Sequence, residues 1–324
     1  MRFSVIIPVY NRAQELQSLL KSLSEQLFRN FEVIVVEDGS ENTSARIIKD
    51  FQDKLNLKYH FQENTGQGFA RNKGMELAGG EYFVFFDSDC VVPPNYLEML
   101  HKAITESKLD AHGGPDDAGQ DFSTWQKAMN FSMTAFLTTG GIRGQMKDPA
   151  KYQARGYNMG FSREVYQNTG GFIHPNMAED IELSLRIKKA GFRLELVREA
   201  FVYHQRKNNF LSFIRQSFQF GRNRVFIRNY HKDALKPVHL LPVVFLLGLL
   251  LLPSALLLFP TIGKWLAATY GLWTIAIFFS AYPTLKVALL SVLTSYGQLT
   301  GYGAGVIWQA FAYGTNVPNI KSIN

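Results

Sequence analysis

The fold of this chain is decided by one stretch, Tyr82-Phe83-Val84-Phe85-Phe86-Asp87-Ser88-Asp89. Its first five residues are aromatic or β-branched, which is typical of a buried strand. Two carboxylates separated by one residue follow at once, and such a pair offers hard oxygen ligands to a divalent cation. An Asp-x-Asp pattern by itself is usually a solvated turn, so the preceding strand is what favours a functional interpretation.

Strand and helix patterns alternate in the sequence before this stretch. Compact apolar runs at residues 4–9, 31–36 and 57–61 indicate strands, and helical patterns separate them. We expect Asn11 to cap the first of these helices. Alternation with short loops predicts a parallel sheet covered by helices on both faces, which is the doubly wound, Rossmann-like α/β class.

Polar motifs stand where the predicted strands end: Asn11-Arg12, Glu37-Asp38, Asn64 and Asp87-Ser88-Asp89. Ligands of such sheets bind at the carboxyl ends of the strands, so these motifs predict a binding site at that edge. Further along, residues 110–171 are rich in glycine and are predicted to form loops around a cleft. Glu179 and Asp180 then open a helix that Gly191 ends.

The composition is uneven along the chain. It has 324 residues and a formal net charge of +7, and charged residues become rare towards the C-terminus. This shift predicts an N-terminal globular domain over residues 1–230 and a membrane-associated helical region over 231–324. Residues 238–262 and 265–283 are long and apolar enough to span a bilayer, although a buried core helix is an alternative for the first. For residues 287–313, spanning and interfacial placements both remain open.

Five basic residues come directly before the first apolar segment: Arg222, Arg224, Arg228, Lys232 and Lys236. Such a cluster can bind nucleic acid, but its place beside an apolar segment favours membrane lipids as the partner instead. Cys90 is the single cysteine, which excludes an intrachain disulfide framework and fits a reducing compartment. The first apolar run is too short for a secretory signal, so we expect the N-terminal domain on the cytoplasmic side of the inner or plasma membrane.

Eight short motifs follow one another in the sequence: Ser4-Val5-Ile6-Ile7-Pro8-Val9-Tyr10-Asn11, Glu37-Asp38-Gly39-Ser40, Asn64-Thr65-Gly66, Ala70-Arg71-Asn72-Lys73-Gly74, Asp87-Ser88-Asp89, Asn158-Met159-Gly160-Phe161, Gly170-Gly171-Phe172 and Glu179-Asp180. Each is modest alone, but the ordered set resembles the family-2 glycosyltransferases and covers residues 1 to about 205. The resemblance implies a GT-A fold, metal-dependent use of a nucleoside diphosphate sugar, and inversion at the anomeric carbon.

The resemblance also implies roles for residues at the nucleotide. The family's nucleotide-binding positions match Pro8, Tyr10, Asp38, Arg71 and Asp87. Of these, Pro8 and Tyr10 would meet the base, Asp38 would recognise it, and Asp87 would lie on the ribose side. Glu37 departs from the commoner Asp, which leaves the nucleotide open, although a UDP-sugar is expected.

A metal ligand, Asp89, and an acid pair, Glu179-Asp180, are the residues expected to act at the reacting atoms. By resemblance, Asp89 holds Mg²⁺ or Mn²⁺, which neutralises the charge growing on the departing diphosphate. Asp180 matches the catalytic base, with Glu179 beside it in support, although an acid pair also suits any helix N-terminus. His204 is a candidate third metal ligand, with a structural histidine as the alternative.

Three further residues are candidates for the acceptor or diphosphate side: Asp116, Asn158 and Arg222. Arg222 belongs to Gln219-Phe220-Gly221-Arg222-Asn223, which partly matches the Gln-x-x-Arg-Trp signature of processive polysaccharide synthases. Asn223 replaces the tryptophan, so transfer of one sugar to a lipid-linked or glycan acceptor near the membrane is preferred. A synthase subunit and a non-catalytic nucleotide-sugar-binding membrane protein remain the alternatives.

Overall fold

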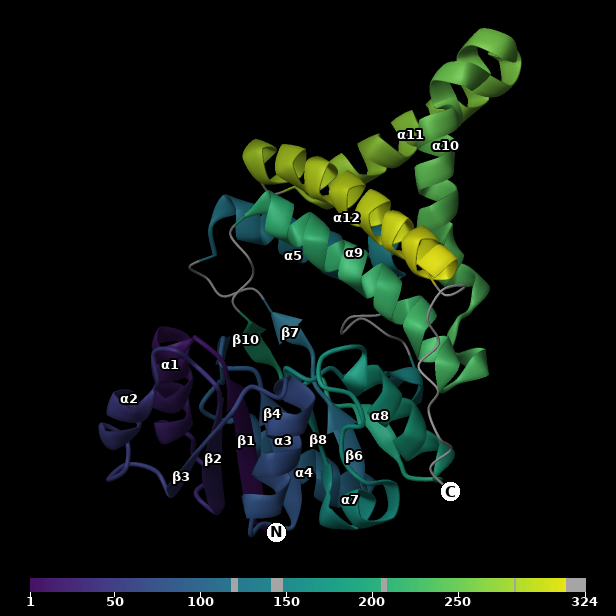
Figure 1. Cartoon of the computed structure of the whole chain (residues 1–324). Helices are drawn as coiled ribbons and strands as arrows, with labels where there is room; N and C mark the ends of the chain where they lie inside the picture. Colours follow the sequence, from purple (N-terminus) through teal and green to yellow (C-terminus); the bar gives the residue numbers. More distant parts are fainter. Residues whose placement is uncertain (118–121, 141–147, 205–208, 283, 313–324) are drawn as a thin grey trace. The chain divides into compact units, whose positions relative to one another are not determined.

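The computed structural model describes residues 1–117, 122–140, 148–204, 209–282 and 284–312 (Figure 1). The chain forms two compact units, of which the first comprises Met1–Gln120 with Gly141–Gln205 and the second comprises Asp121–Gly140 with Arg206–Asn324. The division therefore lies near residue 205 and not at the expected residue 230. Its cause is the helix over Phe210–Phe226, which packs against the last helix of the second unit.

Seven strands form the main sheet of the first unit: β1 (Phe3–Val9), β2 (Phe31–Asp38), β3 (Leu57–Gln62), β4 (Tyr82–Phe86), β6 (Ala111–Gly113), β8 (Asn158–Ser162) and β9 (Leu194–Leu196). Their order is β3-β2-β1-β4-β8-β6-β9. The strands from β3 to β4 run parallel, as predicted, whereas β8 is antiparallel to both of its neighbours. The sheet is therefore mixed.

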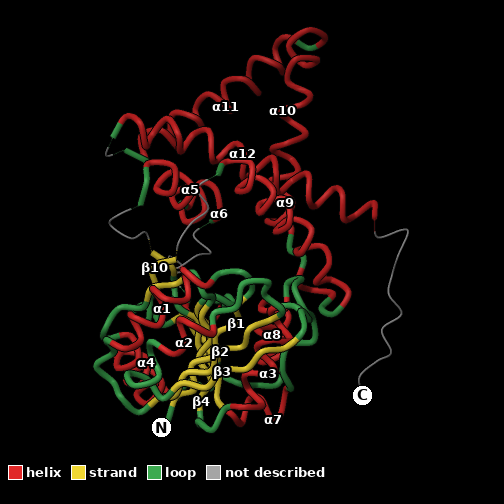
Figure 2. Tube along the Cα trace, turned by 60° about the vertical axis from the view of Figure 1, so that its left-hand side comes forward, coloured by secondary structure: helices red, strands yellow, loops and turns green. Residues whose placement is uncertain are grey.

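Helices cover both faces of this sheet, which confirms the doubly wound architecture (Figure 2). Side chains alternate along β1, so Val5 and Ile7 enter one core and Ile6 enters the other. The first core is closed by α1 (Ala13–Ser24), α2 (Ala45–Lys49) and α4 (Tyr96–Ser107). The second is closed by α3 (Gln67–Leu77), α7 (Arg163–Thr169) and α8 (Glu179–Lys189).

Two local expectations were wrong. Asn11 does not cap α1, because its backbone is left-handed (φ 53°) and its side-chain oxygen accepts a hydrogen bond from the Glu41 N–H at 2.9 Å. The described residues within 110–171 are also more regular than expected, and Gly160 of β8 allows close approach of the two neighbouring strands at Phe83 and His112. A small second sheet is formed by β5 (Cys90–Val91), β10 (Val202–His204) and β7 (Asp116–Asp117), in the order β5-β10-β7.

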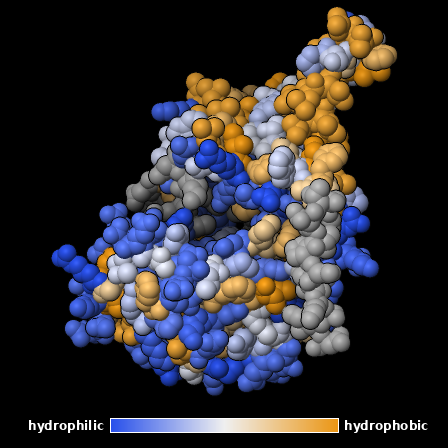
Figure 3. Space-filling view, viewed as in Figure 1, coloured by the Kyte–Doolittle hydropathy of each residue, from blue (hydrophilic) through white to orange (hydrophobic). Residues whose placement is uncertain are grey.

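The second unit is helical. Its helices are α5 (Thr124–Thr134), α6 (Phe136–Thr139), α9 (Phe210–Phe226), α10 (Leu241–Leu258), α11 (Pro260–Ser280) and α12 (Leu285–Ala312). Among the described residues, Pro237–Leu258 and Pro260–Ser280 are long and apolar enough to cross a membrane. The break between them falls at Phe259, earlier than expected, because Pro260 starts a new helix. Figure 3 shows apolar side chains gathered over α10 and α11.

A buried carboxylate fastens the edge of the sheet at which the parallel strands begin. Glu32 is 1% exposed and accepts hydrogen bonds from Ser4 Oγ at 2.8 Å and from the Gly79 N–H at 2.6 Å. Lys58 Nζ lies 3.0 Å from its other oxygen. Burial opposes ionisation of Glu32, but these donors outweigh it and lower its pKa.

We expect Glu32→Gln to destabilise the chain by about 1.5–3 kcal/mol at neutral pH, because a charged acceptor of buried hydrogen bonds is lost. A lowered pKa means that the carboxylate stabilises the fold above its ordinary pKa of 4.5 and that this contribution vanishes as pH falls through the folded-state pKa. The apparent melting temperatures of the two proteins should therefore converge below about pH 4.5. Glu81→Gln, at an exposed carboxylate, is the matched control. An equal loss in both variants would contradict the assignment.

Candidate active site

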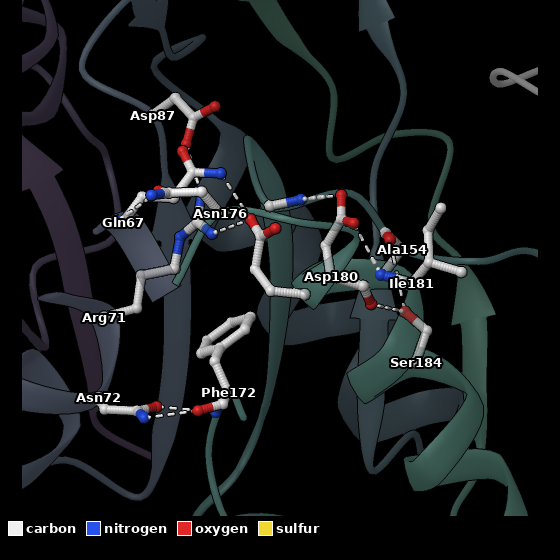
Figure 4. A network of polar contacts seen from close by, with 12 residues as sticks. Gln67, Arg71, Asn72, Asp87, Ala154, Phe172, Asn176, Asp180, Ile181 and Ser184 are labelled. Atoms are coloured by element: carbon white, nitrogen blue, oxygen red, sulfur yellow. Dashed lines mark hydrogen bonds and ion pairs between the residues drawn. The ribbon is translucent and has the colours of Figure 1, made fainter. Parts of the chain in front are cut away.

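One buried arginine joins the two acidic motifs of the first unit (Figure 4). Arg71 of α3 is 1% exposed; its Nη2 lies 2.7 Å from Asp87 Oδ1, and its Nη1 lies 3.0 Å from Glu179 Oε1. Its guanidinium lies over the Phe172 ring, 5.3 Å from the centroid. A Cβ at Gly156 would overlap the guanidinium, so glycine is needed there. The acid that follows β4 and the acid that opens α8 are thereby held on one cation.

The loop that leads to the acid pair is attached to the same helix, α3. The Asn72 amide donates to the Phe172 carbonyl and accepts from the Phe172 N–H, both at 2.8 Å (Figure 4). The Gly68 N–H donates to the Pro175 carbonyl at 2.7 Å. Gln67 Nε2 donates to Glu179 Oε1 at 2.6 Å. One helix therefore fixes both the loop and the first acid of the pair.

The two acids at the start of α8 differ in their surroundings. Ala178 before them has a left-handed backbone (φ 53°), an uncommon conformation for a residue with a Cβ. Glu179 is 4% exposed, whereas Asp180 is half-buried. Asp180 Oδ2 accepts from the Gly156 N–H at 3.1 Å and its Oδ1 accepts from the Ile181 N–H at 2.7 Å. Asp180 is thus the more accessible of the two carboxylates and is oriented by main-chain donors.

Glu179 ionises at a higher pH than an ordinary glutamate. Burial, and then the neighbouring Asp180 charge, raise the pKa of Glu179 to about 7, although Arg71 acts in the opposite direction. Burial also opposes the charge on Arg71, but Asp87, Glu179 and Asp180 outweigh it and raise the pKa of the guanidinium. Arg71 therefore stays charged beside the two carboxyl groups.

The expected nucleotide residues lie where β1 and β2 end. Pro8 is buried within β1, and Tyr10 beyond it is 52% exposed. Asp38 is 3% exposed, and its carboxylate accepts from the Thr65 N–H at 2.9 Å and the Gly66 N–H at 2.8 Å. Asp38 therefore fastens the loop before α3, a contact that the sequence analysis did not anticipate.

Glu37, which stands where aspartate is commoner, has partners for its carboxylate within the protein. It accepts a hydrogen bond from Ser40 Oγ, another from the Ser44 N–H at 2.8 Å and a longer one from Tyr59 at 3.3 Å. Burial, then the charge of Glu37, raise the pKa of Tyr59 to about 12. Glu37 therefore braces the loop after β2 from within the protein.

The expected metal ligand lies beside an arginine. Asp89 forms an ion pair with Arg12. Burial lowers the pKa of the Arg12 guanidinium, but the Asp89 charge and hydrogen bond outweigh burial, so this pKa is raised. Asp87 and Asp89 supply carboxylate oxygens, the ligand type that Mg²⁺ and Mn²⁺ prefer. Within the described residues, no group of three His, Cys, Asp or Glu side chains converges on one point. The His204 side chain lies outside the description.

Three other candidates have partners within the protein. Tyr157 donates to Asp116 at 3.0 Å. Asn158 is fully buried, accepts from Tyr96 at 2.6 Å and donates to the Ala200 carbonyl at 2.9 Å. This geometry gives Asn158 a structural role in place of the expected ligand contact. Arg222 belongs to the second unit, where its Nε donates to Gln309 at 3.0 Å.

Sequence reasoning gave Gln67 and Asn72 no part in the site, and it placed Arg12 at a strand end without predicting its ion pair with Asp89. Gln67 and Arg71 are four residues apart on one helix, a spacing that places two side chains on the same face. That spacing was the available signal for Gln67. No local pattern indicates that Asn72 pairs with Phe172, which lies 100 residues further along the chain.

We expect Arg71→Met to destabilise the chain by about 3–5 kcal/mol at pH 8, because it leaves buried carboxylate charge without its partner. At pH 6 the loss should be smaller. Glu179 has a pKa of about 7, and removal of the cation raises it further, so the carboxyl group is protonated there. Apparent melting temperatures at the two pH values measure this difference.

Arg163→Met is the matched control, because the Arg163 guanidinium donates to the Ala78 and Gly80 carbonyls at 2.8 Å and lies over the Phe83 ring. Its melting temperature should fall by the same amount at both pH values. A pH-independent loss in Arg71→Met would contradict the charge assignment.

Relatives match this chain over different lengths. Glycosyltransferase GlyA of Streptococcus pneumoniae is 39% identical over 110 residues, which cover 34% of this chain and 16% of the relative. Glycosyltransferase AglE of Haloferax volcanii is 25% identical over 258 residues, which cover 76% of this chain and 81% of the relative. This chain thus spans less than a fifth of GlyA's length but most of AglE's.

Solved structures show the same fold. The mannosyltransferase PcManGT of Pyrobaculum calidifontis, in complex with GDP-Man and Mn²⁺, superposes with a TM-score of 0.63 at 19% identity, covering 96% of this chain and 87% of that one. Residues 1–349 of S. aureus TarS, in complex with UDP-GlcNAc, superpose with a TM-score of 0.51 at 20% identity. This match covers 97% of this chain and 92% of the TarS chain. The expected GT-A fold is confirmed. Residues 4–170 match the family model described as Glycosyl transferase family 2, and the chain belongs to that family.

Proposed function

We propose that this chain transfers one sugar, with inversion, from a nucleoside diphosphate sugar to a hydroxyl group of a lipid-linked or membrane-proximal acceptor. One observation carries this proposal: the Arg71 guanidinium contacts both Asp87, beyond β4, and Glu179, directly before Asp180. Acids that serve the leaving group and the attacking hydroxyl must lie on either side of one reacting carbon. A shared cation keeps these two acidic motifs within such a distance.

Asp180 is the proposed general base. Its carboxylate is half-buried and oriented by the Gly156 and Ile181 N–H groups, so it can accept the proton of an incoming hydroxyl. Glu179 is the less suitable base, because Gln67 and Arg71 occupy its Oε1 atom in the interior. In this proposal Glu179 fixes the start of α8 through its contacts with Gln67 and Arg71.

Asp89 and Asp87 are the residues that would hold a divalent cation at the diphosphate. Both offer carboxylate oxygens at the edge where β4 ends, and the presence of Mn²⁺ with GDP-Man in PcManGT supports a metal in a protein of this fold. When bound, the cation supplies positive charge that stabilises the departing diphosphate. Arg12 holds Asp89 in place before the ligands arrive.

The nucleotide is proposed to lie at the ends of β1 and β2. Tyr10 is exposed there, and Asp38 fixes the Thr65-Gly66 loop that leads into α3. Two solved structures with this fold contain a bound nucleotide sugar: PcManGT contains GDP-Man, and TarS contains UDP-GlcNAc. A UDP-sugar is the proposed donor for this chain.

The proposed acceptor follows from the second unit. Two of its helices, α10 and α11, are long and apolar enough to cross a bilayer, and basic residues precede them. Attachment to the inner or plasma membrane, with the first unit in the cytoplasm, would restrict the enzyme to acceptors at the lipid surface. Measurement of product length with a labelled donor separates single transfer from processive synthesis.

We expect Asp180→Asn to lower kcat by about 10²–10⁴-fold, because the amide cannot take up the hydroxyl proton. Donor affinity should change little, since no donor-binding residue is altered. Turnover of a set of labelled nucleotide sugars and calorimetric binding of UDP measure the two quantities. Asp53→Asn, on the exposed surface, is the control. Unchanged turnover would remove Asp180 from the mechanism, and absent turnover in the parent chain would favour a binding protein.

We expect Mn²⁺ to raise the melting temperature of the chain in the presence of UDP, and a chelator to reverse the increase. Asp89→Asn should abolish this metal-dependent increase, because the amide oxygen is a weaker ligand than a carboxylate. UDP binding by calorimetry, with and without Mn²⁺, gives a second measurement that is independent of turnover. Asp117→Asn, at an exposed position, is the control. A metal effect that survives in Asp89→Asn would exclude this residue as a ligand.

A further inference from the structure

The last helix of the second unit, α12, carries exposed apolar side chains along one side, where Lys286 near its start is also exposed. Its exposed large side chains are Leu285, Leu289, Leu293, Trp308 and Phe311, each between 45% and 80% accessible. At about 100° per residue, these five positions fall within an arc of about 140°. Three residues of this apolar stripe lie near the start of α12 and two lie near its end, on one side of the helix.

Another part of the circumference of α12 is covered by α9 and α5. Gly297, Gly301 and Gly305 leave no room for side chains, because a Cβ at each would crowd α9. Ser132 of α5 lies 2.6 Å from Thr294 and 3.0 Å from Ser295, oxygen to oxygen. In both views α12 lies between the pair α5 and α9 and the hairpin of α10 and α11 (Figures 1 and 2).

The hairpin crosses α12 on the face that carries the stripe. Tyr296 Oη lies 2.9 Å from Thr274 Oγ1, and its ring packs on Phe245 and Trp273. Gly303 packs against the backbone of Pro242. Tyr296 and Gly303 fall within about 20° of Leu285 around the helix axis. These contacts lie near the start of α10 and the end of α11, so α12 contacts the base of the hairpin.

A third membrane crossing by α12 conflicts with its partner α9. The two helices are packed backbone against backbone at Gly301 and Gly305, so α9 would follow α12 into the hydrocarbon. Arg215 is exposed on α9, and Arg222 lies on the same helix. Arginines exposed to hydrocarbon are strongly unfavourable. The packing therefore excludes a position of α12 across the bilayer with α9 attached.

We infer that α12 lies in the plane of the membrane, with its stripe among the acyl chains and α9 on the aqueous side. This inference rests on the membrane attachment in the proposed function. The partner is a bilayer with anionic headgroups, which the exposed Arg228, Lys232 and Lys236 would meet just before the hairpin. From Pro242 the hairpin extends by about 25 Å, close to the hydrocarbon thickness of about 30 Å.

A bilayer fits this surface better than a second copy of the chain. No residue of α10 is buried within the structure, so the side of this helix that does not pack on α11 and α12 requires an apolar environment. The stripe on α12 lies on the side from which α10 and α11 extend, so one continuous apolar phase covers all three helices. Ser291, Thr294, Ser295 and the four glycines of α12 are buried within the protein.

The test measures the depth of α12 in vesicles. Single cysteines replace Leu285, Phe311, Leu250 and Arg215 in the full chain, and each carries an environment-sensitive fluorophore. Cys90 is buried and should take up no label, which the parent chain verifies. The vesicles contain phosphatidylcholine and phosphatidylglycerol with quenchers either near the headgroup or at mid-chain.

Leu285 and Phe311 are about 39 Å apart along the helix, so their depths distinguish the two placements. We expect both to be quenched equally by the shallow quencher, Leu250 by the mid-chain quencher, and Arg215 by neither. Labels at Leu285 and Phe311 that reach opposite leaflets would overturn the in-plane placement, as would labels that no lipid quenches while Leu250 is quenched. An unquenched Leu250 would instead refute membrane attachment itself, whatever the transferase assay shows.

Discussion

The first unit depends on the burial of one positive charge between two negative ones. Burial of a guanidinium is unfavourable unless its N–H donors have hydrogen-bond acceptors and its charge has a negative partner. Arg71 satisfies this condition only because the turn after β4 and the start of α8 reach it from different parts of the chain. The absence of a side chain at Gly156 and the ring of Phe172 complete the space around it. Residues from four separate parts of the chain therefore surround this one guanidinium.

The sheet was predictable where periodicity carries the information. Apolar runs that end in polar motifs indicated β1, β2 and β4, and the parallel pairing of these strands followed from the alternation with helices. Nothing in the short run at Asn158–Ser162 indicated an antiparallel strand, because strand direction is set by partners far away in the sequence. The same limit applies to α5, whose Ser132 pairs with Thr294, 162 residues later.

At the site, the sequence indicated which residue types meet where the parallel strands end, but not which contacts each of them makes. Arg71 was expected at the nucleotide, and the structure shows that it also holds the two acidic motifs together. Asp38 was expected to recognise a base, and in the structure it fastens a loop. Such assignments depend on hydrogen bonds between residues far apart in the chain, and motif spacing contains no information about them.

The attachment of the acid-bearing loop to α3 constrains how the site can move. Asn72 holds the loop at Phe172, Gly68 holds it at Pro175, and a side chain at Gly68 would strike the His174 carbonyl. The loop therefore cannot swing alone as a flap over an incoming sugar. Any induced fit on this side must displace α3 and the start of α8 as one rigid body, and so must tighten or loosen both ends of the site in concert.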